Sequence, residues 1–371
     1  MSFTKNLIDY GKYTVQIKRG LQTPLILIHF VTTRCNLKCH HCFYWKELNK
    51  PGDMGFEEQA KMIRSLKHPL ESALLTGGET FLFKEIADLC EVYSKENKTK
   101  NINLTTNGFT PKFIRDRAVD ILSKVKSNVH IQVSIDGIKE DHDKVRAMDG
   151  SFDKAIETIK LLKELKNDYT NFSVNALTVL SNKNHFKLDQ IMNLVNELGV
   201  DHAFELIRGT DYFAVRPRLA DVNPKTKEEY GLPEFDDLEY IYEKLKDNYD
   251  VTHTRKNWLD LHRTVFLSKM EMAVKILKKQ APLMECQAGN LIGVVYPDGN
   301  IGVCELLETG DNIKNYDYDF AKAWNSEKMD KLREKVKGCF CTHGCFLQST
   351  MYHSPYHYGK QVVKNKLGIL G

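Results

Sequence analysis

Three cysteines lie within eight residues near the start of the chain, in the stretch Cys35-Asn-Leu-Lys-Cys39-His-His-Cys42. They follow an apolar run, Leu-Ile-Leu-Ile-His-Phe-Val-Thr-Thr, which has the composition of a buried strand. Thiolates at this spacing bind metals or form disulfides. A structural zinc site would need a fourth ligand, which His40 or His41 could supply, but tandem paired half-sites are absent. A three-thiolate iron–sulfur cluster would leave one iron without a protein ligand, and such a vacancy is typical of a catalytic site.

The chain as a whole has the composition of an ordinary globular protein. Of its 371 residues, 42% are apolar and 27% are charged, with a net charge of +4 and a pI near 8.4. This charge is too weak to indicate nucleic-acid binding, and no apolar run approaches the roughly 20 residues that span a bilayer. Residues 1–20 lack the apolar core of a signal peptide, so we expect a cytoplasmic protein. That reducing compartment disfavours a disulfide, and a helical stripe at positions 35, 39 and 42 would be an unusual use of cysteine.

A second group of cysteines lies near the end of the chain. Its members are Cys286, Cys304, Cys339, Cys341 and Cys345. The last three have the spacing Cys-x-Cys-x3-Cys, which is compatible with a zinc ribbon or with an iron–sulfur cluster. His343 lies among them, and we expect it to be a poorer ligand in an otherwise all-thiolate set. The remaining cysteine, Cys90, lies on the apolar face of an expected helix, and we interpret it as core packing.

Strand-like runs alternate with segments of helical period between residues 25 and 210. Strands are expected at 25–33, 72–78, 102–108, 129–137, 172–180 and 202–209. Helices are expected at 56–66, 85–97, 111–126, 152–166 and 186–198, with Ser151 as the N-cap of the fourth. Six such units predict an α/β fold with a parallel sheet. Because the usual closed barrel has eight, we expect a partial (β/α)6 TIM-like barrel or an open sheet, with the active site at the C-terminal ends of the strands.

The rest of the chain divides into shorter parts. A Pro-Asp-Gly-Asn turn at 297–300 predicts a β-hairpin, and a helical pattern follows at 318–337. We interpret this stretch as a small appended domain that holds all five late cysteines. The expected division is an N-terminal extension 1–24, a core 25–210, a loop and helical connector 211–282 with helices near 236–248 and 255–279, the appended domain 283–345, and a weakly patterned tail 346–371.

The three-cysteine motif resembles the signature of the radical S-adenosylmethionine (SAM) enzymes, in which Cys-x3-Cys-x2-Cys follows the first strand of a βα series. Further motifs follow at the ends of later strands: Thr-Gly-Gly-Glu at 76–79, Thr-Thr-Asn-Gly at 105–108 and Ser-Ile-Asp-Gly at 134–137. The resemblance covers about residues 22–210. It implies that Cys35, Cys39 and Cys42 hold a [4Fe-4S] cluster and that SAM binds the iron they leave open.

The same resemblance implies which side chains contact SAM. The Gly-Gly-Glu motif would hold the amino group, polar residues after the fourth strand would lie near the ribose, and Arg146 would meet the carboxylate. Ala147 replaces the glycine that usually follows this arginine. Each residue also has an ordinary interpretation as a turn, a cap or a solvated charge. The implied SAM contacts are Phe43, Thr76, Gly77, Gly78, Glu79, Thr106, Asn107, Ser134, Asp136 and Arg146.

The late cysteines resemble the twitch or SPASM extension of radical SAM enzymes, which holds auxiliary [4Fe-4S] clusters. The resemblance is carried by Cys-Gln-Ala-Gly at Cys286 and by the Gly-x4-Cys pattern that ends at Cys304. The two-cluster SPASM form has seven or more cysteines, so the five present here imply one auxiliary cluster. Cys286, Cys304 and Cys345 would be ligands, with either Cys341 or Cys339 as the fourth.

The resemblance implies an enzyme that cleaves SAM reductively to a 5′-deoxyadenosyl radical and removes hydrogen from an unactivated C–H bond, with flavodoxin or ferredoxin as the electron donor. Our main expectation is oxidation, epimerisation or rearrangement of a small molecule such as a sugar or nucleotide-sugar. Arg208, Arg216 and Arg218 are candidates to bind its phosphate, or they are solvated charges. The alternative is a peptide- or protein-modifying enzyme that forms thioether, carbon–carbon or epimerised products. Many such relatives carry an N-terminal peptide-recognition domain for which residues 1–24 are too short. A lipid substrate is a weaker option.

Overall fold

Six parallel strands form the centre of the protein, as the sequence predicts. The computed structural model describes residues 22–208, 230–252 and 261–354. Each of the six strands pairs in parallel with the next, so their C-terminal ends meet at one edge of the sheet. The strands are β1 (Ile26–Thr32), β2 (Ser72–Gly77), β3 (Asn101–Thr106), β4 (Asn128–Ser134), β5 (Phe172–Leu180) and β6 (Asp201–Leu206).

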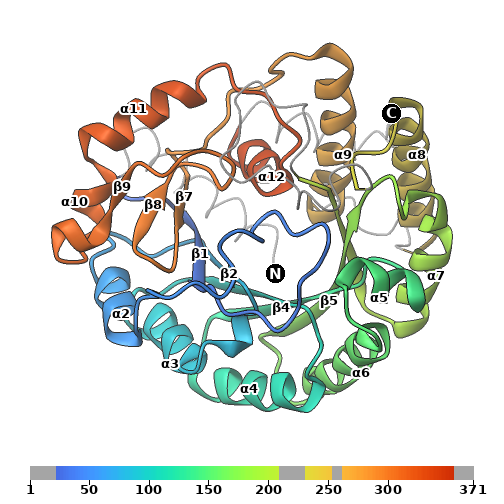
Figure 1. Ribbon diagram of the computed structural model, residues 1–371, viewed down its shortest axis with the longest axis horizontal. Coiled ribbons are helices and arrows are strands. Elements are labelled where there is room, and N and C mark those ends of the chain that lie inside the picture. The colour runs from blue at the N-terminus through green and yellow to red at the C-terminus, as the bar shows by residue number, and fades with distance from the viewer. Residues whose placement is uncertain (1–21, 209–229, 253–260, 355–371) are drawn as a thin grey trace.

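Helices cover the outer face of the curved sheet, and the two layers form the expected partial barrel (Figure 1). The segment expected as one helix at 85–97 is instead α3 continued by a π-helical stretch, η2 (Val92–Glu96). The helices of this ring are α2 (Phe56–Arg64), α3 (Ile86–Glu91), α4 (Pro111–Lys124), α5 (Glu140–Arg146), α6 (Ser151–Glu164) and α7 (Leu188–Leu198). Short 3-10 segments are η1 (Thr80–Leu82), η3 (Leu165–Asn167), η4 (His185–Lys187) and η5 (Ile313–Tyr316).

The start of α6 differs from the expectation that Ser151 caps it. The N-cap is Gly150, at φ 74°, and Ser151 is the first helical residue. Asp143 provides the capping instead, since its carboxylate accepts hydrogen bonds from the Gly150 and Phe152 N–H groups and from the Ser151 hydroxyl. The left-handed conformation that glycine adopts easily turns the chain so that these three donors face one carboxylate. The carboxylate of Asp143 in the preceding helix, α5, therefore takes the place of the Ser151 hydroxyl that we expected to cap α6.

The two faces of the sheet differ chemically. Alternate residues such as Ile102, Leu104 and Val133 are fully buried, and they pack against the helices. Because side chains alternate along a strand, the residues between them point into the barrel. Barrels of this kind are usually filled by branched apolar side chains. Here the interior-facing residues of β3 and β4 and of the first half of β5 are polar, and they include Asn103, Thr105, His130, Gln132 and Asn175, whereas Leu177 and Val179 on the same face of β5 are apolar.

The late hairpin, which we expected to lie in a small appended domain, extends the same sheet. β7 (Ile292–Val295) pairs in parallel with β1, and β8 (Asn300–Gly302) and β9 (Asp311–Asn312) follow as antiparallel strands. The result is one nine-stranded sheet in the order β6-β5-β4-β3-β2-β1-β7-β8-β9. Every residue of β7 is buried, as expected for a strand that is covered on both faces. Helices α10 (Phe320–Trp324) and α11 (Glu327–Val336) complete this region.

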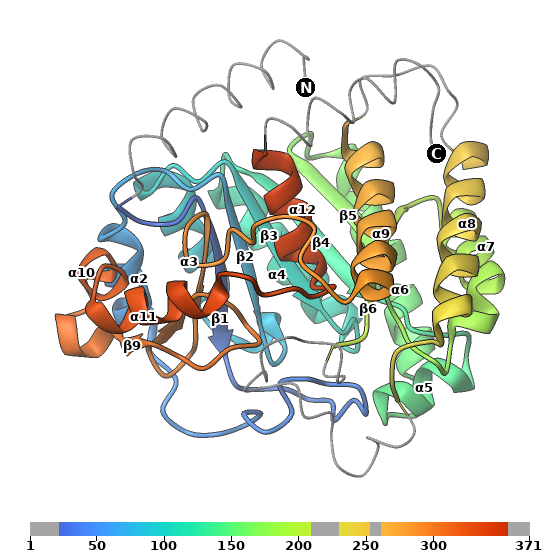
Figure 2. The same ribbon diagram turned by 90° about the horizontal axis from the view of Figure 1, so that it is seen from above.

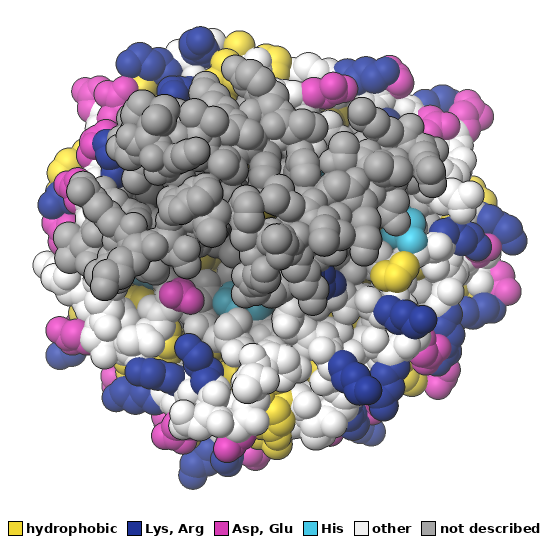
Figure 3. Space-filling view, turned by 180° about the vertical axis from the view of Figure 1, so that it is seen from behind, with side chains coloured by type: hydrophobic (Ala, Val, Ile, Leu, Met, Phe, Trp, Pro, Cys, Tyr) yellow, Lys and Arg dark blue, Asp and Glu magenta, His cyan; other side chains and the backbone are white. Residues whose placement is uncertain are grey.

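Three further helices lie on the side of β6. They are α8 (Phe235–Thr252), α9 (Leu261–Lys279) and α12 (Gly344–His353). α12 lies beside α9, and in Figure 1 it lies between α9 and β7 (Figures 1 and 2). It also crosses the boundary expected at residue 345, so the expected tail begins inside a helix. Within the described ranges, no helix is long and apolar enough to cross a membrane. Over the described part of the face in Figure 3, acidic and basic side chains alternate around the rim.

Candidate functional site

The loop that carries the first three cysteines leaves β1 without forming a helix. Asp53 accepts hydrogen bonds from the Thr32 hydroxyl, at 2.7 Å, and from the Thr33 N–H, at 2.8 Å. Asn49 accepts from the Cys35 N–H at 3.0 Å and donates to the Cys35 carbonyl at 3.2 Å. Asn49 has a φ of 59°, a conformation that asparagine tolerates better than most residues. These two polar side chains fix the backbone of the loop. In the sequence, the only sign of this role is that Asn and Asp are residue types common in turns.

The three thiols of this loop are half-buried, and each has a raised pKa. Burial raises the pKa of Cys35 to about 11 and that of Cys42 to about 12, and it also raises the pKa of Cys39. Neighbouring thiols add to the effect at Cys35 and Cys42. Such thiols are protonated at neutral pH unless a metal stabilises the thiolates. The donor set therefore fits a group that binds several thiolates at once, as an iron–sulfur cluster does.

The Gly-Gly-Glu motif holds this loop through backbone contacts. Gly78 donates its N–H to the Thr32 carbonyl at 2.9 Å, and Glu79 donates its N–H to the Arg34 carbonyl at 2.7 Å. A Cβ at Gly77 would overlap the Thr32 carbonyl oxygen, and a Cβ at Gly78 would overlap that of Arg34. Gly77 also has a φ of 136°, which favours glycine. Both glycines are therefore explained by the close approach of the cysteine loop to the end of β2.

The Glu79 carboxylate is buried and is held by donors from β3. It accepts from the Thr106 hydroxyl and the Asn107 N–H, both at 2.8 Å, and from the Phe81 N–H at 3.2 Å. Burial raises the pKa of Glu79, and these hydrogen bonds oppose the rise. A carboxylate has about four acceptor sites, so these three bonds leave room for one more donor. An ammonium group such as the amino group of SAM has the right chemistry for that place.

Asn107 connects the end of β3 to the cysteine loop. Its Nδ2 donates to the Asn36 Oδ1 at 2.8 Å, and its Oδ1 accepts from the Phe109 N–H at 2.9 Å. Beside it, the Thr105 hydroxyl donates to the Thr76 hydroxyl at 3.1 Å. Asn36 was not among the predicted site residues, because nothing in its local sequence distinguishes it from an ordinary loop asparagine. Of the other predicted residues, Ser134 is half-buried at the end of β4.

Asp136 and Arg146 bind each other beneath the cysteine loop. An oxygen of Asp136 lies 2.5 Å from the Arg146 Nη2, and Arg146 Nη1 lies 3.7 Å from the Cys39 sulfur. His41 Nε2 lies 3.6 Å from the same carboxylate oxygen. Burial alone would raise the pKa of Asp136, but Arg146, together with His41, His142 and the Val179 N–H, outweighs burial, and the pKa is lowered. The structure thus brings both residues to the cluster loop, as a buried ion pair that supports Cys39.

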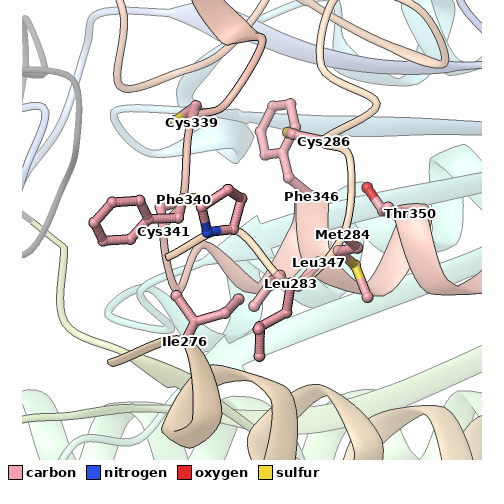
Figure 4. Close-up of a pocket in the computed structure, with 11 residues that line it drawn as sticks. Ile276, Leu283, Met284, Cys286, Cys339, Phe340, Cys341, Phe346, Leu347 and Thr350 are labelled. Carbon is pink, nitrogen blue, oxygen red and sulfur yellow. The ribbon is translucent and has the colours of Figure 1, made fainter. Parts of the chain in front are cut away.

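The late cysteines surround the second candidate centre. Three of them, Cys286, Cys339 and Cys341, line a small apolar cavity of about 20 Å³ together with Phe340 and Phe346 (Figure 4). Burial raises the pKa of Cys339 to about 11 and that of Cys341 to about 12. Burial likewise raises the thiol pKa of the other three, Cys286, Cys304 and Cys345.

Cys304 and Cys345 adjoin a group of buried charges. Glu305 follows Cys304 in the chain, and its carboxylate lies 2.6 Å from the His343 Nε2 and 3.2 Å from the Arg208 Nη1. In the described parts of the chain, no three His, Cys, Asp or Glu side chains form a ready-made site for a single metal ion. The five thiols fit an iron–sulfur cluster by donor type. Arg216 and Arg218 lie outside the described residues. Cys90 is fully buried in the core, as predicted.

Comparisons with known proteins agree with this chemistry. Residues 30–195 match the radical SAM superfamily. The chain is 30% identical over 204 residues to the sporulation killing factor maturation protein SkfB of Bacillus subtilis (strain 168), a match that covers 55% of this chain and 46% of that protein. It is 25% identical over 350 residues to the antilisterial bacteriocin subtilosin biosynthesis protein AlbA of the same strain, covering 89% and 69%. It is 24% identical over 360 residues to the cysteine-type anaerobic sulfatase-maturating enzyme of Clostridium novyi (strain NT), covering 86% and 87%.

Two solved structures have the same fold over most of the chain. Streptococcus suis SuiB bound to the precursor peptide SuiA has a TM-score of 0.61 at 15% identity, covering 88% of this chain and 70% of that one. The anSMEcpe structure with bound AdoMet has a TM-score of 0.60 at 19% identity, covering 92% and 99%. At these identities the likeness concerns the fold. It extends well beyond residue 195, so the late part of the chain shares it.

Proposed function

The chain belongs to the radical SAM superfamily, and from this premise we propose that it modifies a peptide or protein substrate. The sequence led us to expect a small molecule such as a nucleotide-sugar, and the comparisons favour the alternative. Two of the relatives are named for maturation and one for bacteriocin biosynthesis. The observation that carries the proposal is that two of these matches cover 86% and 89% of this chain, which is far more than the domain at 30–195.

The polar lining of the barrel supports a peptide substrate on physical grounds. Gln132 and Asn175 lie opposite each other on β4 and β5, and Asn103 lies opposite His130 on β3 and β4. Asn175 is 5% exposed, and its Oδ1 has no hydrogen-bond partner among the described residues. A buried amide without a partner is costly, and a ligand that donates a hydrogen bond removes that cost. Peptide N–H and C=O groups have the complementary chemistry.

The residues of the mouth have separate roles in this proposal. SAM and a reduced cluster, when bound, supply a 5′-deoxyadenosyl radical that removes a hydrogen atom from a C–H bond. Cys35, Cys39 and Cys42 would hold the cluster, and Glu79 would hold the SAM amino group at its remaining acceptor site. The Arg146–Asp136 pair would fix the loop at Cys39, and the polar barrel wall would hold the peptide. A flavodoxin or ferredoxin remains the expected reductant.

Deuterium transfer distinguishes the two substrate classes. The full chain, reconstituted anaerobically and reduced with dithionite, is incubated with SAM and either perdeuterated tryptic peptides or deuterated nucleotide-sugars. We expect deuterium in 5′-deoxyadenosine from the peptides, and label from the nucleotide-sugars alone would refute the proposal. Asn175→Leu should reduce the peptide-dependent label about tenfold, because one buried hydrogen bond is lost. Asn167→Leu, the same change at an exposed position in η3 outside the barrel, is the matched control and should change the label little.

A further inference from the structure

Arg208 lies between the two candidate clusters and contacts a neighbour of each. Its guanidinium carbon is 4.6 Å from the centre of the Phe43 ring, and Phe43 directly follows Cys42. Its Nη1 lies 3.2 Å from an oxygen of Glu305, which directly follows Cys304. The Arg208 side chain is 19% exposed and that of Glu305 is 4% exposed. A single cation therefore connects the loop of the first cluster to the loop of the second.

The charges around Arg208 form a closed group beside the late cysteines. The second oxygen of Glu305 lies 2.6 Å from His343, which stands between Cys341 and Cys345 in the chain. A second buried pair, Glu205 and Lys269, is joined at 2.7 Å. Glu305 therefore lies between His343 and the guanidinium of Arg208, and Arg208 is the permanent cation that compensates its charge.

Fixed charges on residues next to a cluster's ligands affect the energy of adding an electron to that cluster. Reduction adds one negative charge, so a nearby cation favours it and a nearby anion opposes it. Both effects are stronger where burial excludes water. Arg208 and Glu305 oppose each other as long as both are present, and the loss of either would leave a net charge in a buried site. Removing Arg208 and removing Glu305 should therefore shift the reduction potential of the late cluster in opposite directions.

We propose that the Arg208–Glu305 ion pair sets the reduction potential of the cluster held by the late cysteines. Arg208 keeps the reduced form accessible by compensating Glu305, and Glu305 prevents the cation from overstabilising it. Because Arg208 also covers the Phe43 ring beside Cys42, the same side chain holds the two cluster loops in a fixed relation. This role goes beyond the choice of substrate, and it requires only that the late cysteines hold a cluster.

A charge cycle tests the inference in the reconstituted full chain. Redox titration followed by electron paramagnetic resonance gives the ratio of reduced to oxidised late cluster at each potential. Arg208→Met should lower that ratio about tenfold at a fixed potential, or about 59 mV for a one-electron couple. Glu305→Gln should raise it by a similar factor. The double variant should return close to the native ratio, and Arg208→Lys should keep most of it.

Two further variants of the chain serve as controls. The Cys35→Ala, Cys39→Ala, Cys42→Ala variant assigns the signal of the late cluster. Arg64→Met is the matched control, since Arg64 and Glu96 form an exposed pair at 2.6 Å and its loss should not change the ratio. Unchanged ratios in all variants, or shifts of the same sign for Arg208→Met and Glu305→Gln, would overturn the proposal. If Arg208→Met does not fold, absence of the rise in Glu305→Gln overturns it, as does a native protein that binds no late cluster.

Discussion

The two cysteine regions use similar side chains but hold their loops by different means. Each has a buried arginine–carboxylate pair beside a histidine: Arg146 with Asp136 and His41 in the first, and Arg208 with Glu305 and His343 in the second. The first loop is also fixed by backbone contacts with Gly77 and Gly78, where no side chain fits. At the second, the close neighbour of Gly344 is the Glu205 carboxylate. A new side chain at Gly77 or Gly78 would have to displace the backbone of the loop, whereas one at Gly344 would displace only the side chain of Glu205.

This difference suits the chemistry that we assign to each region. A cluster that must bind SAM in one orientation needs its loop held within a fraction of an ångström. A cluster that only exchanges electrons tolerates more movement, and its potential depends on the charges around it. The contacts of the first region therefore fix the position of its loop, and those of the second region set the charge around its cluster. Each of the following predictions tests one side of that contrast.

The largest effect is expected from removing the first three thiols together. The variant Cys35→Ala, Cys39→Ala, Cys42→Ala should form no 5′-deoxyadenosine, because no cluster remains to bind and reduce SAM. The iron content should fall from about eight to about four per chain, with the absorbance of the late cluster retained. Cys90→Ala is the control for loss of a cysteine as such, since Cys90 is buried in the apolar core. Formation of 5′-deoxyadenosine by the triple variant would contradict the assignment, and a native content of four irons would remove the second cluster.

The next effect concerns the backbone contact at the first region. Gly78→Ala should slow 5′-deoxyadenosine formation about 100-fold, because the new Cβ displaces the backbone at Arg34 and misplaces Cys35. Gly344→Ala should cost less than about tenfold, since the Glu205 side chain can move. Gly231→Ala is the matched control, with nothing within 4 Å of its Cβ, and should behave like the native protein. Equal losses at Gly78 and Gly344 would remove the contrast between the two regions.

Sequence reasoning could place the residues of the first region near one another because its signals are local. The three cysteines, the Gly-Gly-Glu motif and the strand ends all lie in short segments, and a parallel sheet brings such ends to one edge. The pairing of Arg146 with Asp136 was less visible, although both residues were expected at the mouth. Their mutual ion pair depends on how α5 folds back over the end of β4.

The second region was harder because its contacts join distant parts of the chain. β7 pairs with β1, and no local pattern marks β7 as the neighbour of one strand more than another. The sequence therefore did not indicate that the late hairpin continues the core sheet. Arg208 and Glu305 are 97 residues apart. The sequence indicated Arg208 only as a phosphate ligand or a solvated charge, and nothing in it singled out Glu305. The polar barrel wall was present as alternation in β3 and β4, but alternation alone does not tell which face is the interior.

The smallest effect is expected at the far end of α12, the helix that begins in the second region and ends at the start of β2. Its first turn lies beside Glu205, and its last residue, His353, binds Glu71 at 2.8 Å, immediately before β2. Burial lowers the pKa of His353, but the hydrogen bond with Glu71 and the charge of Glu71 outweigh it, and the net shift is upward. A raised pKa means that the pair stabilises the fold fully below the unfolded value of about 6.5, and that this contribution disappears as the pH rises through the folded value.

His353→Gln should therefore lower the free energy of unfolding by about 1 kcal/mol at about pH 5.5 and by less at about pH 9. Thermal melting of the native and variant proteins at the two pH values measures the difference. Glu71→Gln should remove the same pH-dependent part, because the coupling needs both partners. If the His353→Gln deficit were equal at both pH values, the contact would contribute only packing. The charge pairing of the second region would then not extend to the far end of α12.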